Sequence, residues 1–189
     1  MTDKPLPSPE LLRKLLRYEP ETGKLYWMPR PPSMYEGKRR RPAQLAATWN
    51  TQFAGTEALA YLTNGYPYGQ VLGRSVSAHR VIWAMAYGAW ATGVIDHING
   101  ITTDNRLENL REVTHSANMQ NSKRTARNTS GTMGVHFEAR GQRWIARVVV
   151  DGTRRHIGTF RDKQDAITAV VNARPAHGYH QNHDRPNST

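Results

Sequence analysis

The sequence predicts an α+β protein made of two small units, each with short antiparallel strands and helices. Short apolar segments flank the turn dipeptides Asn64-Gly65 and Asp151-Gly152, which are typical of tight hairpins. Apolar residues with helical spacing occur only in short stretches. A small, basic and unpatterned segment, residues 122–131, separates two groups of elements. We therefore expect it to be a linker with one unit on either side.

Composition points to a polyanionic partner. The 189 residues include 26 lysines and arginines against 15 aspartates and glutamates, which gives a net charge of +11. Such an excess favours nucleic-acid binding, because cationic side chains displace condensed counterions. A basic protein of the ribosomal type is the alternative. The absence of cysteine excludes disulfides, thiolate zinc sites and cysteine nucleophiles. Neither a signal core nor a long apolar run is present, so we expect a cytoplasmic protein.

The N-terminal segment, residues 1–58, is predicted to hold a helix and a basic loop. Residues 8–18 favour a helix, because Ser8 can cap it, Pro9 suits its first position and leucines recur on one face. A turn then leads to a short strand at 25–27. Residues 29–44 are rich in proline, arginine and glycine and predict a loop, which is either a solvated charge run or a phosphate-contacting segment.

Residues 59–121 form the next predicted unit. A hairpin at 59–78 precedes a buried helix at 78–88, which Gly88 would end. His79 at the start of that helix could contact phosphate, but we expect a structural role. A strand at 93–98, a long turn, a strand at 110–114 and a helix at about 115–121 follow.

Asp96, His97, Asn109 and Asn118 lie in this last stretch and suit phosphodiester hydrolysis. Histidine is the side chain best matched to take a proton from water near neutral pH, so His97 is the candidate general base. Asp96 and Asn118 offer one carboxylate and one amide oxygen, which suits Mg²⁺ (or Mn²⁺) because such ions keep several waters. Neighbouring side chains on a strand face opposite sides. A local bend would therefore be needed to aim Asp96 and His97 at one phosphate.

The pattern resembles the HNH nuclease family of the ββα-metal type over residues 75–122. The likeness rests on Ile95-Asp96-His97-Ile98-Asn99-Gly100, on Asp104 to Leu110 and on Val113 to Asn118. It implies that His97 is the general base, that Asn109 holds the loop, and that Asp96 and Asn118 bind the metal. Asparagine in place of the last histidine is similar to the phage and intron-homing branch, and it favours magnesium or manganese over zinc.

The resemblance implies a metal-dependent endonuclease acting on double-stranded DNA, typical of a phage or mobile-element homing enzyme in the host cytoplasm. We expect a monomer without membrane association. The alternative is a sequence-specific DNA-binding regulator with an inactive nuclease core.

Residues 132–180 predict a separate DNA-binding domain, followed by a tail at 181–189. Strands at 133–138, 142–150 and 153–158 precede a helix at about 162–174. Alternation places Trp144, Ala146, Val148 and Val150 toward that helix and leaves a basic outer face. Such a face can enter a major groove. A solvated charged face is the alternative.

Three segments of this domain resemble the plant Apetala-two/ethylene-response-factor DNA-binding domain: Gly134 to Phe137, Trp144 to Val148 and Ile157 to Phe160. Arg147 stands where plant members carry an acid, so the target sequence does not transfer. The basic face, the linker and this resemblance give nine candidate DNA-binding residues: His136, Arg140, Arg143, Arg147, Arg154 and His156 in the domain, and Lys123, Arg124 and Arg127 in the linker.

Overall fold

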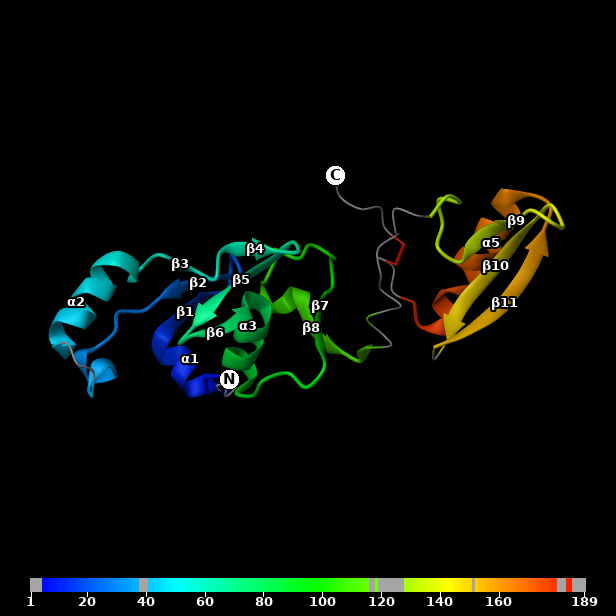
Figure 1. Ribbon diagram of the computed structural model, residues 1–189. Helices are drawn as coiled ribbons and strands as arrows, with labels where there is room; N and C mark the ends of the chain where they lie inside the picture. Colours follow the sequence, from blue (N-terminus) through cyan, green and yellow to red (C-terminus); the bar gives the residue numbers. More distant parts are fainter. Residues whose placement is uncertain are drawn as a thin grey trace. The chain divides into compact units, whose positions relative to one another are not determined.

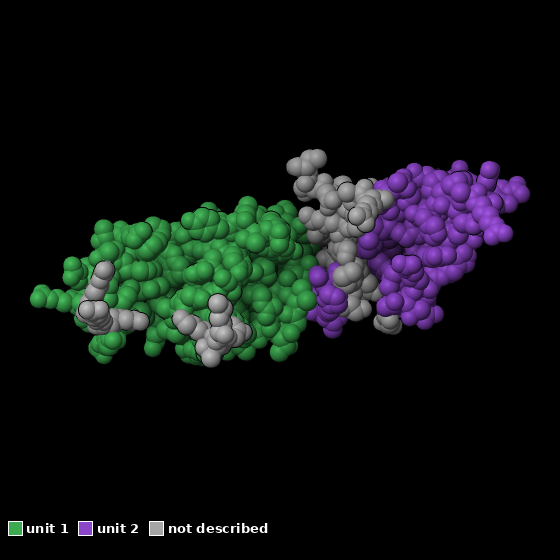
Figure 2. All heavy atoms as spheres, viewed as in Figure 1, with its two compact units in different colours: residues 1–112 green, residues 113–189 purple. Residues whose placement is uncertain are grey.

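The computed structural model describes residues 5–37, 41–115, 118, 128–150, 152–179 and 183–184. Small antiparallel sheets and helices make up the described chain, which confirms the α+β class (Figure 1). The chain divides into two compact units, residues 1–112 and 113–189, which are treated separately below (Figure 2). The division lies inside the stretch that the sequence predicts as one nuclease core.

The first unit begins with helix α1 (Pro9–Leu15). Ser8 caps it as predicted, because its Oγ accepts a hydrogen bond from the backbone N–H of Leu11 at 3.2 Å. The predicted end at residue 18 is wrong. Strand β1 (Leu16–Glu19) follows at once and pairs antiparallel with β2 (Lys24–Trp27). These residues therefore gain a strand partner that the helical spacing of the leucines did not reveal.

Strand β3 (Glu57–Ala58) completes this first sheet, in the order β1-β2-β3. The predicted loop at 29–44 is only partly correct, since it contains the 3₁₀ helix η1 (Pro32–Tyr35) and the start of helix α2 (Pro42–Phe53). Pro42 at the first helical position was an available signal for α2. Residues 38–40 of the basic run lie outside the described residues.

The hairpin predicted at 59–78 is confirmed. Strands β4 (Tyr61–Thr63), β5 (Tyr66–Val71) and β6 (Arg74–Ser77) form an antiparallel sheet in that order. Asn64 and Gly65 both have positive φ, 52° and 82°, as a type I′ turn requires. The predicted helix is also confirmed as α3 (Ala78–Tyr87), which ends at Gly88 in the left-handed conformation.

Strands β7 (Val94–His97) and β8 (Leu110–Val113) form a two-stranded sheet, with the 3₁₀ helix η2 (Leu107–Asn109) just before β8. One apolar core joins these strands to α1, α3 and the two preceding sheets. Its largest fully buried side chains are Leu12, Leu15, Leu16, Leu25, Val71, Val81 and Ile82. The core therefore fixes β7 against α3.

The second unit contains strands β9 (Val135–Glu138), β10 (Arg143–Val150) and β11 (Thr153–Phe160), helix α5 (Lys163–Ala173) and the 3₁₀ helix η3 (Pro175–His177). The sheet order is β11-β10-β9. The predicted packing is confirmed, because one face of the sheet and α5 share a core of buried Val135, Ala146, Val148, Ala166 and Val170. The other face carries Arg143, Arg147 and Arg154.

Within the described part of the chain, no helix combines the length and the apolar character needed to cross a membrane.

Candidate functional site

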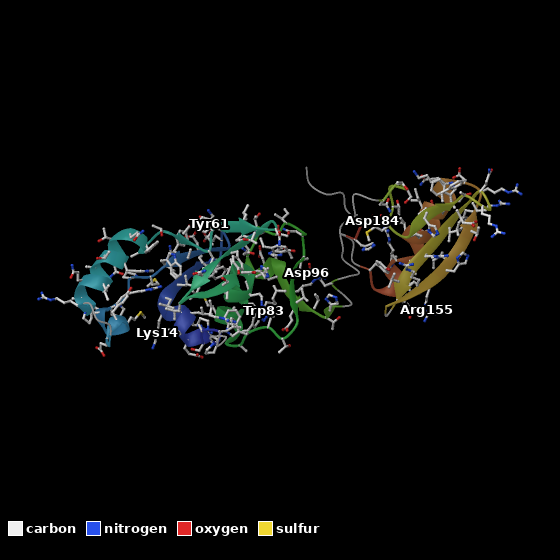
Figure 3. The ribbon with its side chains drawn as sticks, viewed as in Figure 1. Lys14, Tyr61, Trp83, Asp96, Arg155 and Asp184 are labelled. Carbon is white, nitrogen blue, oxygen red and sulfur yellow. The ribbon has the colours of Figure 1, made fainter. Side chains whose placement is uncertain are left out.

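The candidate site is centred on β7 and on the loop 98–109 that joins it to β8. Burial alternates along β7: Ile95 and His97 are buried, whereas Val94 and Asp96 are half-buried. Asp96 and His97 therefore point to opposite sides of the strand, as the strand period requires. Figure 3 marks Asp96 on this two-stranded sheet.

His97 is only 3% exposed, and its Nε2 lies 2.9 Å from Oδ1 of Asn105. An amide oxygen has no proton to donate, so Nε2 carries the hydrogen of the pair. The neutral ring then has its lone pair on Nδ1. Asn105 is itself 2% exposed, so the hydrogen bond lies in a protected setting that fixes the tautomer. The sequence patterns did not identify Asn105 as a site residue.

Two further aromatic rings surround His97. The ring of His79 lies edge-on to it, with centroids 5.3 Å apart, and the ring of Tyr66 lies 5.9 Å away. Burial, together with nearby His97 and Arg80, lowers the pKa of His79 to about 4. His79 is therefore a neutral, packed side chain at neutral pH. Nδ1 of His79 is buried and has no hydrogen-bond partner in the described part of the protein.

Asn109 connects the two ends of the loop. Its Oδ1 accepts a hydrogen bond from the backbone N–H of Asn99 at 2.9 Å, and its Nδ2 donates to Oδ1 of Asn99 at 3.0 Å and to the carbonyl of Asp104 at 2.7 Å. The backbone carbonyl of Asn109 also accepts from the N–H of Ile98 at 2.8 Å. Asn109 thereby closes the loop immediately after His97.

The N-terminal hairpin supports the same loop from outside. The hydroxyl of Tyr18 donates to the carbonyl of Asn105 at 3.3 Å and accepts from the N–H of Leu107 at 2.9 Å. Gly23, in the β1–β2 turn, packs so tightly that a Cβ atom there would lie 2.6 Å from the backbone N of Arg106. The loop is thus held by a segment more than eighty residues earlier in the chain, and no sequence pattern indicated this.

An ion pair strengthens the loop. Arg106 donates to both carboxylate oxygens of Asp104, at 2.8 and 2.7 Å, and this pairing lowers the pKa of Asp104 to about 2. Asp104 also accepts from Nδ2 of Asn99 at 2.7 Å. The hydroxyl of Thr102 donates to the carbonyl of Gly65 at 2.6 Å, which joins the loop to the β4–β5 turn.

Asp96 has partners different from those of His97. Nε and Nη2 of Arg111 on β8 donate to its Oδ2 at 3.1 and 2.8 Å, and its side chain is 11% exposed. A carboxylate in this setting has the right donor chemistry for Mg²⁺ or Mn²⁺, although it already shares one oxygen with a cation. No three His, Cys, Asp or Glu side chains gather as a metal cluster among the described residues. The predicted site does not require such a cluster, because its protein ligands are one carboxylate and one amide oxygen and water supplies the remaining ligands.

The remaining predicted residue of the nuclease motif belongs to the second unit. Asn118 is half-buried and donates its backbone N–H to the carbonyl of Thr114 at 3.0 Å, one helical turn earlier. The predicted linker contacts Lys123, Arg124 and Arg127 lie outside the described residues.

The outer sheet face of the second unit gathers most of its predicted DNA-binding residues. Arg147 pairs with His156 on β11 and Val149 with Arg154, while His136 on β9 pairs with Ile145. Gly134, His136, Arg147, Val149 and Arg154 line a hollow of about 370 Å³. No described acidic side chain forms an ion pair with Arg143, Arg147 or Arg154. Arg140 lies apart, in the turn before β10.

Comparison with known proteins identifies the part of the chain that contains the candidate site. The profile of the HNH endonuclease family matches residues 76–120. Protein 3.8 of Escherichia phage T7 is 30% identical over 97 residues, which are 51% of this chain and 79% of the phage protein. No solved structure matches the chain significantly. The chain therefore belongs to the family of phage T7 Protein 3.8 and carries an HNH endonuclease domain at residues 76–120.

Proposed function

We propose that this protein is a metal-dependent endonuclease that hydrolyses phosphodiester bonds of double-stranded DNA, encoded by a phage or another mobile element as a homing enzyme. The HNH family match and the phage relative support the nuclease class. The observation that carries the proposal further is the hydrogen bond between Nε2 of His97 and Oδ1 of Asn105.

That hydrogen bond supports the role of His97 as general base. With the hydrogen held on Nε2, the basic lone pair of the neutral ring is on Nδ1. In our proposal Nδ1 takes a proton from water, and the resulting hydroxide attacks the phosphorus. The bond from phosphorus to the 3′ oxygen then breaks, and water returns a proton to that oxygen. Asn105 keeps the ring in the required tautomer throughout.

Asp96 and Asn118 are the proposed metal ligands. Their carboxylate and amide oxygens suit Mg²⁺ or Mn²⁺. When bound, such an ion neutralises charge that grows on the phosphate and on the leaving oxygen. Arg111 orients the Asp96 carboxylate through two hydrogen bonds. Asn109, through its contacts with Asn99 and Asp104, is proposed to hold the loop so that His97 keeps its position.

The second unit is proposed to bind DNA through its outer sheet face. Three antiparallel strands packed on one helix support the likeness to the Apetala-two/ethylene-response-factor domain. Arg147 and Arg154, which have no described ion-pair partner, would contact bases or phosphates. Lys123, Arg124 and Arg127 are proposed to follow the DNA backbone.

Cleavage of supercoiled plasmid DNA in the presence of Mg²⁺ tests the proposal. The wild-type protein should nick or linearise the plasmid, His97→Ala should not, and His177→Ala in η3 should cut like the wild type. Circular dichroism of His97→Ala checks that removing a buried side chain leaves the fold intact. Equal cutting by the wild type and a folded His97→Ala protein would show that His97 is not the general base.

A second function is DNA binding by a regulator that does not cleave. The ion pair between Asp96 and Arg111 favours it, because a carboxylate shared with arginine attracts a metal ion less strongly. Tight duplex binding with no cleavage in either Mg²⁺ or Mn²⁺ would identify this function.

A further inference from the structure

Helix α2 exposes a face for which the proposed nuclease chemistry has no use. Gln44, Thr48 and Gln52 recur every four residues along the 12-residue helix and are exposed. The neighbouring stripe, Ala43, Ala47 and Thr51, is also exposed and consists of small residues. The helix contains no charged residue. This outer face therefore carries small and polar side chains and no charge.

The inner face of α2 is firmly anchored. Asn50 makes two hydrogen bonds with the backbone of Arg30, one to its N–H at 2.8 Å and one to its carbonyl at 3.1 Å. The guanidinium of Arg30 lies 3.7 Å from the ring centre of Trp49, which also packs edge-on against Trp27 at 5.6 Å. The inner face of α2 is thus occupied by its contacts with Arg30 and Trp27. The outer face is exposed and can contact another molecule.

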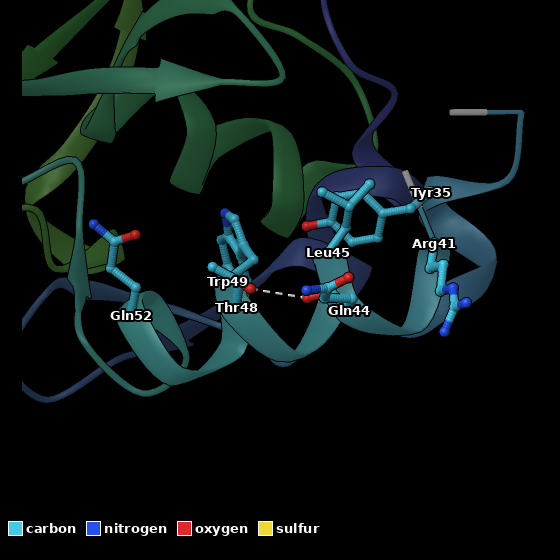
Figure 4. Close-up of a pocket in the computed structure, with 7 residues that line it drawn as sticks. All are labelled: Tyr35, Arg41, Gln44, Leu45, Thr48, Trp49 and Gln52. Carbon is cyan, nitrogen blue, oxygen red and sulfur yellow. Dashed lines mark hydrogen bonds between the residues drawn. The ribbon is translucent and has the colours of Figure 1, made fainter. Parts of the chain in front are cut away.

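The polar groups of the outer face are available for that contact. Thr48 donates its hydroxyl to the carbonyl of Gln44 at 2.9 Å, which leaves its methyl group for apolar contact (Figure 4). Within the described residues, the side-chain amides of Gln44 and Gln52 form no hydrogen bond. These three residues, with Tyr35, Arg41, Leu45 and Trp49, line a hollow of about 540 Å³.

The sequence on either side of the start of α2 is strongly positive. Between residues 28 and 54 the sequence has five lysines and arginines and one glutamate. Arg41 is the N-cap residue, its side chain makes no capping hydrogen bond, and no acid lies in the first turn. A cation at the positive end of a helix dipole is unfavourable by itself. An anionic partner would relieve that cost, so the N-terminal end of α2 complements a polyanion.

We propose that the outer face of α2 is a sequence-reading element that enters the major groove of duplex DNA. The groove is wide enough for a helix, glutamine amides pair with adenine, and the threonine methyl suits thymine methyl. Gln44 and Gln52 are separated by eight residues, or about 12 Å along the helix. With base pairs about 3.4 Å apart, they read positions three to four base pairs from each other.

If α2 binds DNA, the first unit contacts the duplex at a second place, away from the cleavage site. Within the first unit, α2 lies at the end opposite β7 and β8 (Figure 1). A duplex touched at both ends would be read at α2 and cut near His97. The inference rests on the DNA substrate of the proposed function, but it concerns a different surface.

Selection of bound duplexes from a randomised library, in EDTA so that no cleavage occurs, tests the inference. The wild type is compared with the double variant Gln44→Ala, Gln52→Ala and with Gln70→Ala, an exposed glutamine of β5. We expect the double variant to lose preference at two positions three to four base pairs apart. Its affinity for the wild-type motif should fall about ten-fold or more, and Gln70→Ala should match the wild type.

The outcomes separate the two proposals. Alanine favours helix, so the double variant is expected to fold, and its melting temperature verifies this. The same motif and affinity in the wild type and the double variant would overturn the role of α2 while leaving the nuclease proposal in place. If the wild type neither binds any duplex nor cuts plasmid DNA with Mg²⁺, both proposals fail. A uniform loss of affinity with unchanged motif would also overturn base reading by α2.

Discussion

Nε2 of His97 donates a hydrogen bond to Oδ1 of Asn105, eight residues later in the chain, at 2.9 Å. Both side chains are at least 97% buried, so this bond determines which nitrogen of the imidazole is basic. Asn105 touches neither DNA nor metal in the proposed mechanism. It is a positioning residue, and its effect on cleavage passes through the ring of His97.

Asn105→Ala should lower kcat for plasmid cleavage by about 10–100-fold with little change in KM, because the base loses its fixed tautomer and orientation. Nitrogen-15 NMR of the imidazole should show hydrogen on Nε2 in the wild type and a mixture of tautomers in the variant. Asn128→Ala, an asparagine substitution in the second unit, serves as the control. A lower kcat with unchanged His97 resonances would contradict the positioning role.

Gly23 provides a second test of how the loop is held. Gly23→Ala should destabilise the protein by ~3 kcal/mol or more, because φ is +71° and the new Cβ would lie 2.6 Å from the backbone of Asn105 and Arg106. Gly55→Ala is the matched control, since φ is +81° but no atom lies within 4 Å. It should cost only ~1 kcal/mol of conformational strain. Urea unfolding measures both, and equal costs would contradict the close packing.

The local elements of the fold were predictable because their signals are local. Ser8 caps α1, Asn64-Gly65 makes a turn with two positive φ angles, and Gly88 ends α3. Each of these depends on residues within four positions of one another. Periodicity along β10 likewise predicted which side chains pack on α5.

The supports of the candidate site were not predictable, because they join distant parts of the chain. Tyr18 reaches Asn105 and Leu107 across more than eighty residues. Leu16 continues the leucine stripe of α1, but Leu16–Glu19 form a strand because they pair with Lys24–Trp27, a partner that the stripe does not indicate. Propensity and periodicity carry no information on such contacts. The roles of Asp96, His97, Asn109 and Asn118 remain predictions.

His79 makes folding stability depend on pH. Its pKa is lowered from 6.5 to about 4, so between these values the unfolded state binds a proton that the folded state does not. Stability therefore rises with pH across this window and is lost as pH falls. His79→Phe should remove ~2–3 kcal/mol of the difference in unfolding free energy between pH 7 and pH 4. Chemical denaturation at both pH values measures it, and an unchanged difference would mean that His79 is not the source.

Arg147 and Arg154 test the proposed DNA contact of the second unit. Replacing both by alanine should weaken duplex binding about 10–100-fold and flatten its dependence on salt, because two phosphate- or base-contacting cations are lost. Arg161→Ala, an exposed arginine in the connection between β11 and α5, is the matched control. Binding titrations at several salt concentrations measure the slope. If all three proteins bind alike, the outer sheet face is solvated surface.

Substitution of Arg111 tests whether the Asp96 carboxylate is a metal ligand or has only a structural role. Its guanidinium lies 2.8 Å from Oδ2 of Asp96, so it lowers the attraction of that carboxylate for a divalent cation. Arg111→Gln keeps a donor but removes the charge. It should reduce the Mg²⁺ concentration for half-maximal cleavage by about three- to ten-fold, a modest factor because the pair is partly exposed to screening solvent.

Asp96→Asn completes the comparison, because it keeps a similar shape and loses the charge that a cation needs. Cleavage by this variant should require far more Mg²⁺ or be lost, whereas its unfolding free energy should fall only as far as the broken ion pair demands, by ~1–3 kcal/mol. Mg²⁺ titrations of cleavage and urea unfolding separate the two effects. Wild-type Mg²⁺ dependence in both Arg111→Gln and Asp96→Asn would show that Asp96 is not a metal ligand, and the metal would then have to be held by other oxygen atoms.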